Sequence, residues 1–431
     1  MTAHAATRAG CARGGGVWSG DKGGEPVDRQ SARTGARSQS QSQAGAEAGA
    51  EAGAEAQPQS QPQGDIGAET DPSVVAPAAA PPDARGPARP AEPSAPRRRL
   101  RRARRTVLVL VLLVLLPVLA SQIALSLNSL GDPDGSAGTR GRDAIWLGHA
   151  WVDGRKEDAD VTALAARLED TGVHDLYVHA GPLEHDGTLP ATAYPEARWF
   201  IAAVHRAMPG IRVQAWLGDV LASESPHGMR LEDAGTRANV VASTRQILAA
   251  GFQGTHFDLE PLHSGDRNYL TLLDGLHDVT GAHDAALSVA AHQIDPLPGL
   301  HSVRGAVTGH PKWWSQEFFG QVARRVDQIA VMSYDTGQLL ESAYAGYVAQ
   351  QTSLALEATP PGTDLLMGLP FFHENDVGHW EHAETVPAGV RGVRLGLSRT
   401  DADRAAFGVA LYVDFAATES DWTAYREGWV R

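Results

Sequence analysis

The stretch GFQGTHFDLEP, residues Gly251–Pro261, alternates between apolar and polar side chains and ends in two carboxylates, Asp258 and Glu260. In a β-strand, residues two apart lie on the same face. His256, Asp258 and Glu260 would therefore project together, with Glu260 at the C-terminal end of the strand. A carboxylic acid beside a second carboxylate is a common way to raise one pKa and obtain a general acid. The stretch predicts a strand that carries a candidate acid catalyst.

Apolar runs of strand length recur through the C-terminal part of the chain at intervals of roughly 30–40 residues. Besides Gly254–Glu260 they are Ala144–Trp151, Asp175–His179, Ile211–Leu217, Ala286–Ala291, Gln328–Tyr334, Leu365–Phe371 and Gly408–Asp414. Helical periodicity fills most of the connections between them. Eight such β/α units predict an α/β fold of the (β/α)8 TIM-barrel type. An open doubly wound sheet is the alternative, but the strand count and the lack of a glycine-rich phosphate loop argue against it.

The N-terminal third has a different composition and predicts three further regions. Residues 1–105 are rich in Ala, Gly, Gln, Ser and Pro and end in the basic patch RRRLRRARR, so we expect a disordered, low-complexity arm. Residues 106–127 contain no charged side chain and predict a transmembrane signal-anchor. Residues 128–143 are expected to be a linker, and residues 144–431 the barrel.

The arginines before Thr106 indicate the orientation of the apolar segment. Basic residues stay on the cytoplasmic side, so we expect a single-pass protein of the cell membrane with a cytoplasmic N-terminus and an extracellular barrel. A cleaved signal peptide, with Val118–Ala120 as the cleavage site before Ser121, is the alternative. The long polar region that precedes the apolar segment favours a retained anchor.

The distribution of charge and cysteine excludes several classes of function. Of the 37 Lys and Arg and 51 Asp and Glu residues, 15 and 11 lie in residues 1–105 and none in residues 106–127, which leaves 22 and 40 for residues 128–431. A domain this acidic is a poor binder of nucleic acid, so none is expected as a partner. The only cysteine is Cys11, so the barrel has no disulfide.

Active sites of such barrels lie at the C-terminal ends of the strands, which selects the polar and aromatic residues found there. The candidates for substrate binding are Trp151, Trp216, His256, His292, Gln293, Asp335 and Asp414. Several histidines, His149, His179, His256 and His292, also lie near strand ends together with Asp414, which leaves a metal-dependent hydrolase open. The first strand lacks the H-x-H pattern of zinc barrels, so neither a metal nor another cofactor is expected.

Two motifs resemble the family 18 glycoside hydrolases, the chitinases and their relatives. Residues 253–260 are similar to the signature D-G-x-D-x-D-x-E of that family, and VMSYD at Val331–Asp335 is similar to its M-x-Y-D strand. The resemblance implies that Glu260 protonates the glycosidic oxygen and that Asp258 orients the substrate's N-acetyl group. It also implies that Tyr334 binds the acetamido carbonyl and that Asp335 contacts the sugar. Gln253 and His256 stand where the signature has aspartates.

The sequence thus leaves three hypotheses for function. The first is a membrane-anchored glycoside hydrolase that cleaves a polysaccharide or oligosaccharide containing amino sugars, with Glu260, Asp258 and Tyr334 as catalytic residues and the substrate's acetamide as nucleophile. The second is a carbohydrate-binding barrel without turnover. The third is the metal-dependent hydrolase. The retained Glu260 favours the first, because non-catalytic members of the family usually lack this glutamate.

Overall fold

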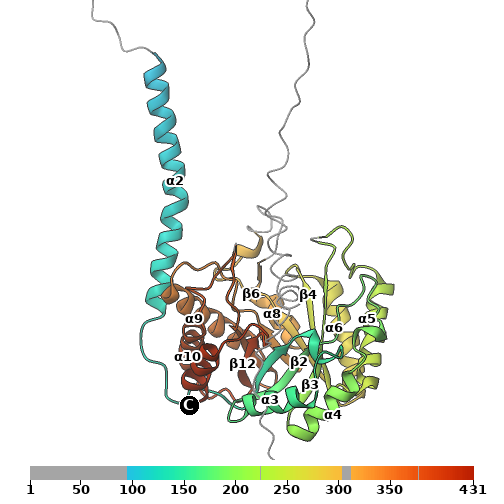
Figure 1. The fold of residues 1–431 in the computed structure, drawn as a ribbon. Helices are drawn as coiled ribbons and strands as arrows, with labels where there is room; N and C mark the ends of the chain where they lie inside the picture. Colours follow the sequence, from blue (N-terminus) through green and yellow to red (C-terminus); the bar gives the residue numbers. More distant parts are fainter. Residues whose placement is uncertain (1–94, 224, 303–311, 377) are drawn as a thin grey trace, which may run out of the picture.

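The computed structural model describes residues 95–431 except residues 224, 303–311 and 377. Residues 1–94 of the predicted arm lie outside this range. Eight parallel strands close a barrel in the order β1-β2-β3-β4-β5-β8-β9-β12 (Figure 1). They are β1 (Asp143–Leu147), β2 (Val173–His179), β3 (Arg212–Val220), β4 (Gly254–Glu260), β5 (Ala286–Ala291), β8 (Gln328–Val331), β9 (Asp364–Pro370) and β12 (Phe407–Tyr412). The predicted (β/α)8 barrel is confirmed, and the open sheet is excluded.

Helices cover the outside of the barrel, and several begin at the capping residues that the sequence supplies. They are α3 (Asp158–Leu168), α4 (Ala197–Ala207), α5 (Ala234–Ala250), α6 (Arg267–Ala282), α8 (Gln316–Ala323), α9 (Glu341–Ala358), α10 (Val386–Thr400) and α11 (Glu419–Tyr425). Asp233 and Asp266 accept backbone N–H groups at the starts of α5 and α6. Short elements complete the chain: η2 (His149–Trp151), η3 (Ala191–Ala193), η4 (Arg426–Val430), and the pairs β6 (Gln293–Ile294) with β7 (Trp313–Trp314) and β10 (Asn375–Asp376) with β11 (His379–Trp380).

Alternation along the strands divides the core into two parts. On β4, Phe257 and Leu259 pack outward against the helices, as the period of two requires. The other face of the strands lines the barrel interior with a cluster that includes Trp146, Tyr177, Trp216, Tyr334 and Tyr412. The interior is therefore filled with aromatic rings, and the residues above them form the barrel's mouth at the C-terminal ends of the strands.

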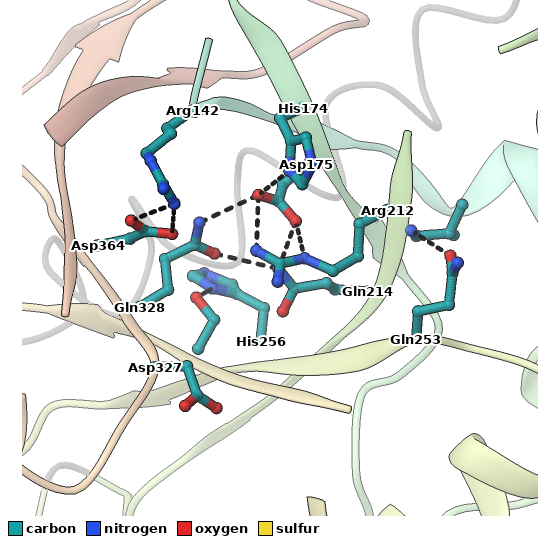
Figure 2. Close-up of polar contacts among 12 residues, drawn as sticks. Arg142, His174, Asp175, Arg212, Gln214, Gln253, His256, Asp327, Gln328 and Asp364 are labelled. Carbon is teal, nitrogen blue, oxygen red and sulfur yellow. Dashed lines mark hydrogen bonds and ion pairs between the residues drawn. The ribbon is translucent and has the colours of Figure 1, made fainter. Parts of the chain in front are cut away.

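A polar network fills the opposite, N-terminal end of the barrel (Figure 2). Asp175 on β2 accepts hydrogen bonds from Arg212 at 2.9 Å, from Gln214 at 2.8 Å and from Gln328 at 3.1 Å. These partners hold the pKa of Asp175 well below its usual range although burial alone would raise it. Asp175 is paired with Arg212, and Asp364 with Arg142, so this network acts as a structural plug.

Two strands end earlier than the sequence predicted. β1 stops at Leu147, and His149–Trp151 form a 3-10 turn, so Trp151 is not a strand residue. β8 stops at Val331, so Tyr334 and Asp335 lie in the following loop. Asp335 has a left-handed backbone with a φ of 55°, a conformation that no strand residue adopts.

Helix α2 (Ala95–Asn128) contains the predicted membrane segment. Its stretch Ala103–Asn128 is long and apolar enough to cross a membrane. The residues after it, predicted as a linker, pack on the barrel: Ala137 is buried, and Thr139 N donates to Trp429 O at 3.0 Å. The chain between helix and barrel is therefore held in place.

Candidate active site

The two carboxylates of β4 lie on the interior face of the strand, as predicted. Asp258 is paired in register with Gly218 on β3, and Glu260 with Val220. The Glu260 side chain keeps 15% of its surface exposed, whereas Asp258 is 7% exposed. Two residues of strand separate their Cα atoms by about 6.6 Å at a rise of about 3.3 Å per residue. Glu260 is thus the more accessible acid at the mouth, and Asp258 lies one layer deeper.

The Trp216 side chain holds Asp258 in place. Its indole N–H donates to Asp258 Oδ2 at 3.1 Å, and the ring is buried in the interior cluster. On the other side, Trp216 packs edge-on against His179 with 4.7 Å between ring centroids. Trp216, predicted to bind substrate, is thus a hydrogen-bond donor to the inner carboxylate.

His292 lies next to Glu260, with 3.9 Å between Nε2 and Oε1. The same Nε2 accepts the backbone N–H of Leu262 at 3.2 Å, so it carries no proton of its own. Burial lowers the pKa of His292 to about 4, which keeps the ring neutral at pH 7. The contact with Glu260 is therefore not an ion pair, and His292 orders the backbone that follows β4.

Two tyrosines flank the carboxylates. Tyr334 stacks on Tyr412 with 5.2 Å between centroids, and Gly368 provides the space, since a Cβ there would lie 2.8 Å from Tyr334 Cε1. Burial raises the pKa of both phenols, and the nearby charge of Asp258 raises it further. Both hydroxyls thus remain protonated and available as donors. The Tyr412 hydroxyl has no hydrogen-bond partner among residues 95–431 as described.

His256, predicted to contact substrate, has no exposed surface. Its ring stacks on Tyr177 at 3.8 Å, and Nδ1 lies 2.8 Å from Ser288 Oγ. Burial lowers its pKa to about 3, so the ring is neutral. His256 is therefore a packed interior residue below Asp258, and the expectation of a direct substrate contact does not agree with this position.

Gln253, the other departure from the signature, lies before the start of β4 and far from its carboxylates. Its Oε1 accepts the backbone N–H of Val213 at 2.9 Å and lies 2.9 Å from His205 Nε2. The position joins β3 to β4 at the N-terminal end of the barrel. The signature has an aspartate where this chain has Gln253. The glutamine contacts β3 at the N-terminal end of the barrel and not the groups at the mouth.

Trp151 and Asp414, two further candidates for substrate binding, are used to connect loops. The Trp151 indole donates to Asp414 Oδ2 at 2.8 Å, and Gly148 N donates to Oδ1 at 2.9 Å. Burial raises the pKa of Asp414. These bonds join the loop after β1 to the loop after β12, and the structure assigns both side chains to that connection.

Gln293 also has an internal role. Its amide donates to the backbone oxygens of Met332 at 3.0 Å and Tyr334 at 2.7 Å, and its Oε1 accepts the Tyr347 hydroxyl at 2.7 Å. The two amide bonds lead to the segment that carries Tyr334, and the third comes from Tyr347 on α9. Gln293 positions that loop and leaves no group of its own for a sugar.

Asp335, expected to contact the sugar, faces a buried imidazole. His379 on β11 places Nδ1 2.9 Å from Asp335 Oδ1 and 3.3 Å from Glu384 Oε2. These two carboxylates raise the pKa of His379 to about 10 against the opposing effect of burial. The ring is thus an imidazolium that joins the β8–α9 loop to the segment after β11. Sequence periodicity offered no sign of His379 or Glu384, which lie in an irregular connection.

The histidines of the metal hypothesis do not converge. His149 and His179 contact each other, with 3.2 Å between their Nδ1 atoms, and the other residues of that set lie at different depths. Over the described part of the chain, the only group of acidic and histidine side chains close enough to hold an ion is Asp335, His379 and Glu384. This group contains none of the residues of the metal hypothesis, so the ligands proposed for it do not form one site.

Comparison with known proteins gives structural neighbours only. No protein-family profile and no curated protein matches the chain. Similar solved structures include the spore cortex-lytic enzyme SleL of Bacillus cereus, at 14% identity over 67% of this chain and 74% of that chain, with a TM-score of 0.47. A chitinase from Chromobacterium violaceum ATCC 12472 is 12% identical over 68% and 99%, with a TM-score of 0.47. A Group IV chitinase from Ostrinia furnacalis is 14% identical over 67% and 99%, with a TM-score of 0.45.

Chitinases, the proteins that the sequence motifs resemble, are thus among the solved structures similar to this chain. At these identities the similarity concerns the fold, and the function depends on the side chains described above.

Proposed function

We propose that this chain is a glycoside hydrolase that cleaves a glycan containing N-acetylated amino sugars. The observation that carries the proposal is the pair on β4: an accessible acid, Glu260, at the mouth and a second carboxylate, Asp258, beneath it on the same face. Glycosidases need a carboxylic acid at the scissile bond to protonate the leaving oxygen.

Each group near Glu260 has a role in this chemistry. Glu260 donates its proton to the glycosidic oxygen. Asp258, fixed by the Trp216 indole, orients the acetamide of the sugar and stabilises the positive charge that develops on it. The acetamide oxygen attacks the anomeric carbon, so the protein need not supply a nucleophile. The Tyr334 hydroxyl, which stays protonated, donates to the acetamide oxygen.

A carbohydrate-binding barrel without turnover is the second candidate, and one observation favours it. His256 replaces an aspartate of the signature and is neutral, so Asp258 has no acidic neighbour beneath it on β4 with which to share a proton. If that proton sharing is essential, the site binds sugars and does not cleave them.

We further propose that residues 106–127 anchor the chain in the cell membrane, with the N-terminus in the cytoplasm. The support is the length and apolar composition of this stretch in α2, together with the arginines that precede it. Protease treatment of intact cells should then degrade the barrel and spare the arm. Release of a barrel that begins at Ser121 into the medium would instead establish a cleaved signal peptide.

The test of the hydrolase is a panel of N-acetylglucosamine oligomers and peptidoglycan fragments, incubated with the full-length chain in detergent. Products are resolved by mass spectrometry, and binding is measured by calorimetry. Wild-type turnover that Glu260→Gln abolishes, with binding retained, supports the hydrolase. Binding without turnover by the wild-type chain across the panel selects the second candidate.

A further inference from the structure

Helix α2 runs parallel to α9 along its last two turns. Gln122 Nε2 donates to Gln338 Oε1 at 2.7 Å, just before α9 begins. One turn later, Ser126 Oγ lies 2.9 Å from Ser342 Oγ. Asn128 Nδ2 then donates to Gly346 O at 2.7 Å. The partners advance in the same direction on both helices, so the helices share a direction.

The parallel arrangement of α2 and α9 places the part of α2 that precedes Gln122 on the mouth side of the barrel. The chain leaves the C-terminal end of β8 at Val331 and enters α9 at Glu341. The first turn of α9 therefore lies at the mouth, and α9 descends toward the N-terminal end. Because α2 is parallel to α9, its residues before Gln122 project beyond the mouth, as Figure 1 shows for the upper part of α2.

The junction between α2 and the barrel is close and bonded on two sides. A Cβ on Gly346 would lie 1.8 Å from Leu125 O, so only glycine permits this approach. On the α10 side, Arg391 donates to Ser129 O at 2.9 Å, and Arg399 donates to Asn128 O at 2.8 Å. The barrel therefore follows the orientation of the helix and does not swing on a flexible tether.

The length of the exposed helix places a bilayer next to the mouth. The apolar side chains of residues 107–113, 115, 116, 118 and 119 are exposed, with Leu113 at 65%. Sixteen residues from Thr106 to Ser121 span about 24 Å at about 1.5 Å per residue. A hydrocarbon core is about 30 Å thick. This part of the helix is no longer than that core, so no exposed helix separates the bilayer from Gln122, where α2 meets the rim of the barrel.

We propose that the mouth of the barrel faces the membrane that α2 crosses, and that the substrate is an amino-sugar glycan attached to a membrane lipid. The orientation follows from the α2–α9 junction. The choice of substrate rests in addition on the proposed glycosidase function. A mouth held against the headgroups meets sugars carried on lipid before it meets a polymer farther from the surface.

Two single-cysteine variants at opposite ends of β3 test the orientation. Both are made in a full-length Cys11→Ser chain, which removes the only natural cysteine. His227→Cys lies in the exposed loop after β3, and Gly210→Cys lies in the exposed turn before it, where a Cβ meets no atom within 4 Å. Each is labelled with a fluorophore in nanodiscs whose lipids carry a headgroup quencher.

The proposal expects strong quenching of the label at position 227 and little at position 210. Equal quenching at both positions, or stronger quenching at position 210, would overturn the orientation. This measurement needs no substrate, so it stands whether or not the chain is a hydrolase.

A flexible insertion tests the choice of substrate. A segment of six leucines followed by about ten Gly and Ser residues, whose flexible part reaches at most about 35 Å, is placed between Ala120 and Ser121. The leucines extend Thr106–Ala120 to a full membrane span, so the Gly-Ser part lies outside the bilayer. The bonds from Gln122 onward are retained, so the fold and the mouth are unchanged. Both chains are reconstituted in vesicles with one chitobiosyl unit, either free in solution or attached to a polyprenyl diphosphate.

We expect the insertion to slow cleavage of the lipid-attached sugar by about tenfold, since the mouth loses its fixed position at the surface, and to leave cleavage of the free sugar unchanged. An equal rate on the lipid-attached sugar with and without the insertion would refute the proposed substrate. Absence of cleavage of both forms by both chains would refute the hydrolase and with it this substrate, while the quenching result would remain valid.

Discussion

At the N-terminal end of the barrel the buried carboxylate of Asp175 is paired with Arg212, whereas at the C-terminal end Asp258 and Glu260 lie beside each other near two phenols. The first arrangement lowers the pKa of Asp175 and satisfies its oxygens. In the second, burial and then the nearby carboxylates raise the pKa of Tyr334 and Tyr412. Charge is neutralised where the barrel needs only stability and is left concentrated where a ligand can use it, a pattern typical of active sites.

The largest effect that tests this contrast is the loss of turnover in Glu260→Gln. Glutamine retains the shape of the side chain but has no proton to donate, and general acid catalysis contributes about 10²–10⁴-fold. We expect kcat to fall within that range on any confirmed substrate and the unfolding midpoint to stay unchanged, because the side chain is partly exposed. Full activity in this variant would remove Glu260 from the mechanism.

The matched change at the N-terminal end of the barrel is Asp175→Asn, which should lower stability and leave turnover unchanged. Breaking a buried ion pair costs about 3–5 kcal/mol, and we expect the lower end because Arg212 keeps 26% of its side chain exposed. Urea unfolding measures this loss. Sugar cleavage per folded molecule should be unchanged, and a comparable fall in kcat would show that the two ends are not separate.

The pH dependence of this pair has a definite sign. Because the folded pKa of Asp175 is lowered, its stabilisation is present above the unfolded value of about 3.9 and is lost as the pH falls toward the folded pKa. The difference in unfolding free energy between the wild-type chain and Asp175→Asn should therefore decrease as the pH falls. A difference that stays constant down to pH 3 would contradict the assigned pairing.

Strand pattern predicted the barrel and the shared strand face of Asp258 and Glu260 but not the polar plug at the opposite end. The alternation in Gly251–Pro261 is local, so one segment is enough to place Asp258 and Glu260 on a common face. Gln214 and Gln328 meet Asp175 only because β2, β3 and β8 are brought around a closed barrel. Contacts that depend on closure of the barrel join residues far apart in the sequence, so no single segment predicts them.

Strand ends and loop contacts were the other source of error. Trp151 and Asp335 were placed at strand ends, but β1 and β8 stop before them, and the loops direct both side chains toward protein partners. Tyr412 was missed because the predicted strand ran to Asp414, and only Asp414 was selected at its end, whereas β12 stops at Tyr412.

His379→Gln tests the imidazolium at the mouth. The folded pKa of His379 is raised to about 10, so its stabilisation is fully present below the unfolded value of about 6.5 and is lost as the pH rises through about 10. Removing one partner of a buried ion pair costs about 3–5 kcal/mol, and we expect the lower end of that range at pH 6, because Asp335 keeps 21% of its side chain exposed, with the difference decreasing toward pH 10.

The control for this prediction is a metal chelator. EDTA should leave the unfolding midpoint of the wild-type chain unchanged at both ends of this pH range, since the assigned partner of Asp335 and Glu384 is the His379 imidazolium and not a metal ion. A large fall in the midpoint on chelation would show that the group holds a metal ion.

The smallest effect compares two buried tyrosines, one at each end of the interior. The Tyr177 hydroxyl donates to Gln328 Oε1 at 2.5 Å, so Tyr177→Phe should lower the unfolding free energy by about 1 kcal/mol. The Tyr412 hydroxyl has no hydrogen-bond partner in the described part of the chain. Tyr412→Phe should therefore change stability by less than about 0.5 kcal/mol.

The same change also tests whether the Tyr412 hydroxyl donates to a sugar oxygen when substrate binds. In that case Tyr412→Phe should lower kcat/KM about three- to tenfold, the equivalent of one hydrogen bond. Equal losses of stability in the two variants would show that Tyr412 is a structural residue like Tyr177, and the contrast between the two ends would then rest on the carboxylates alone.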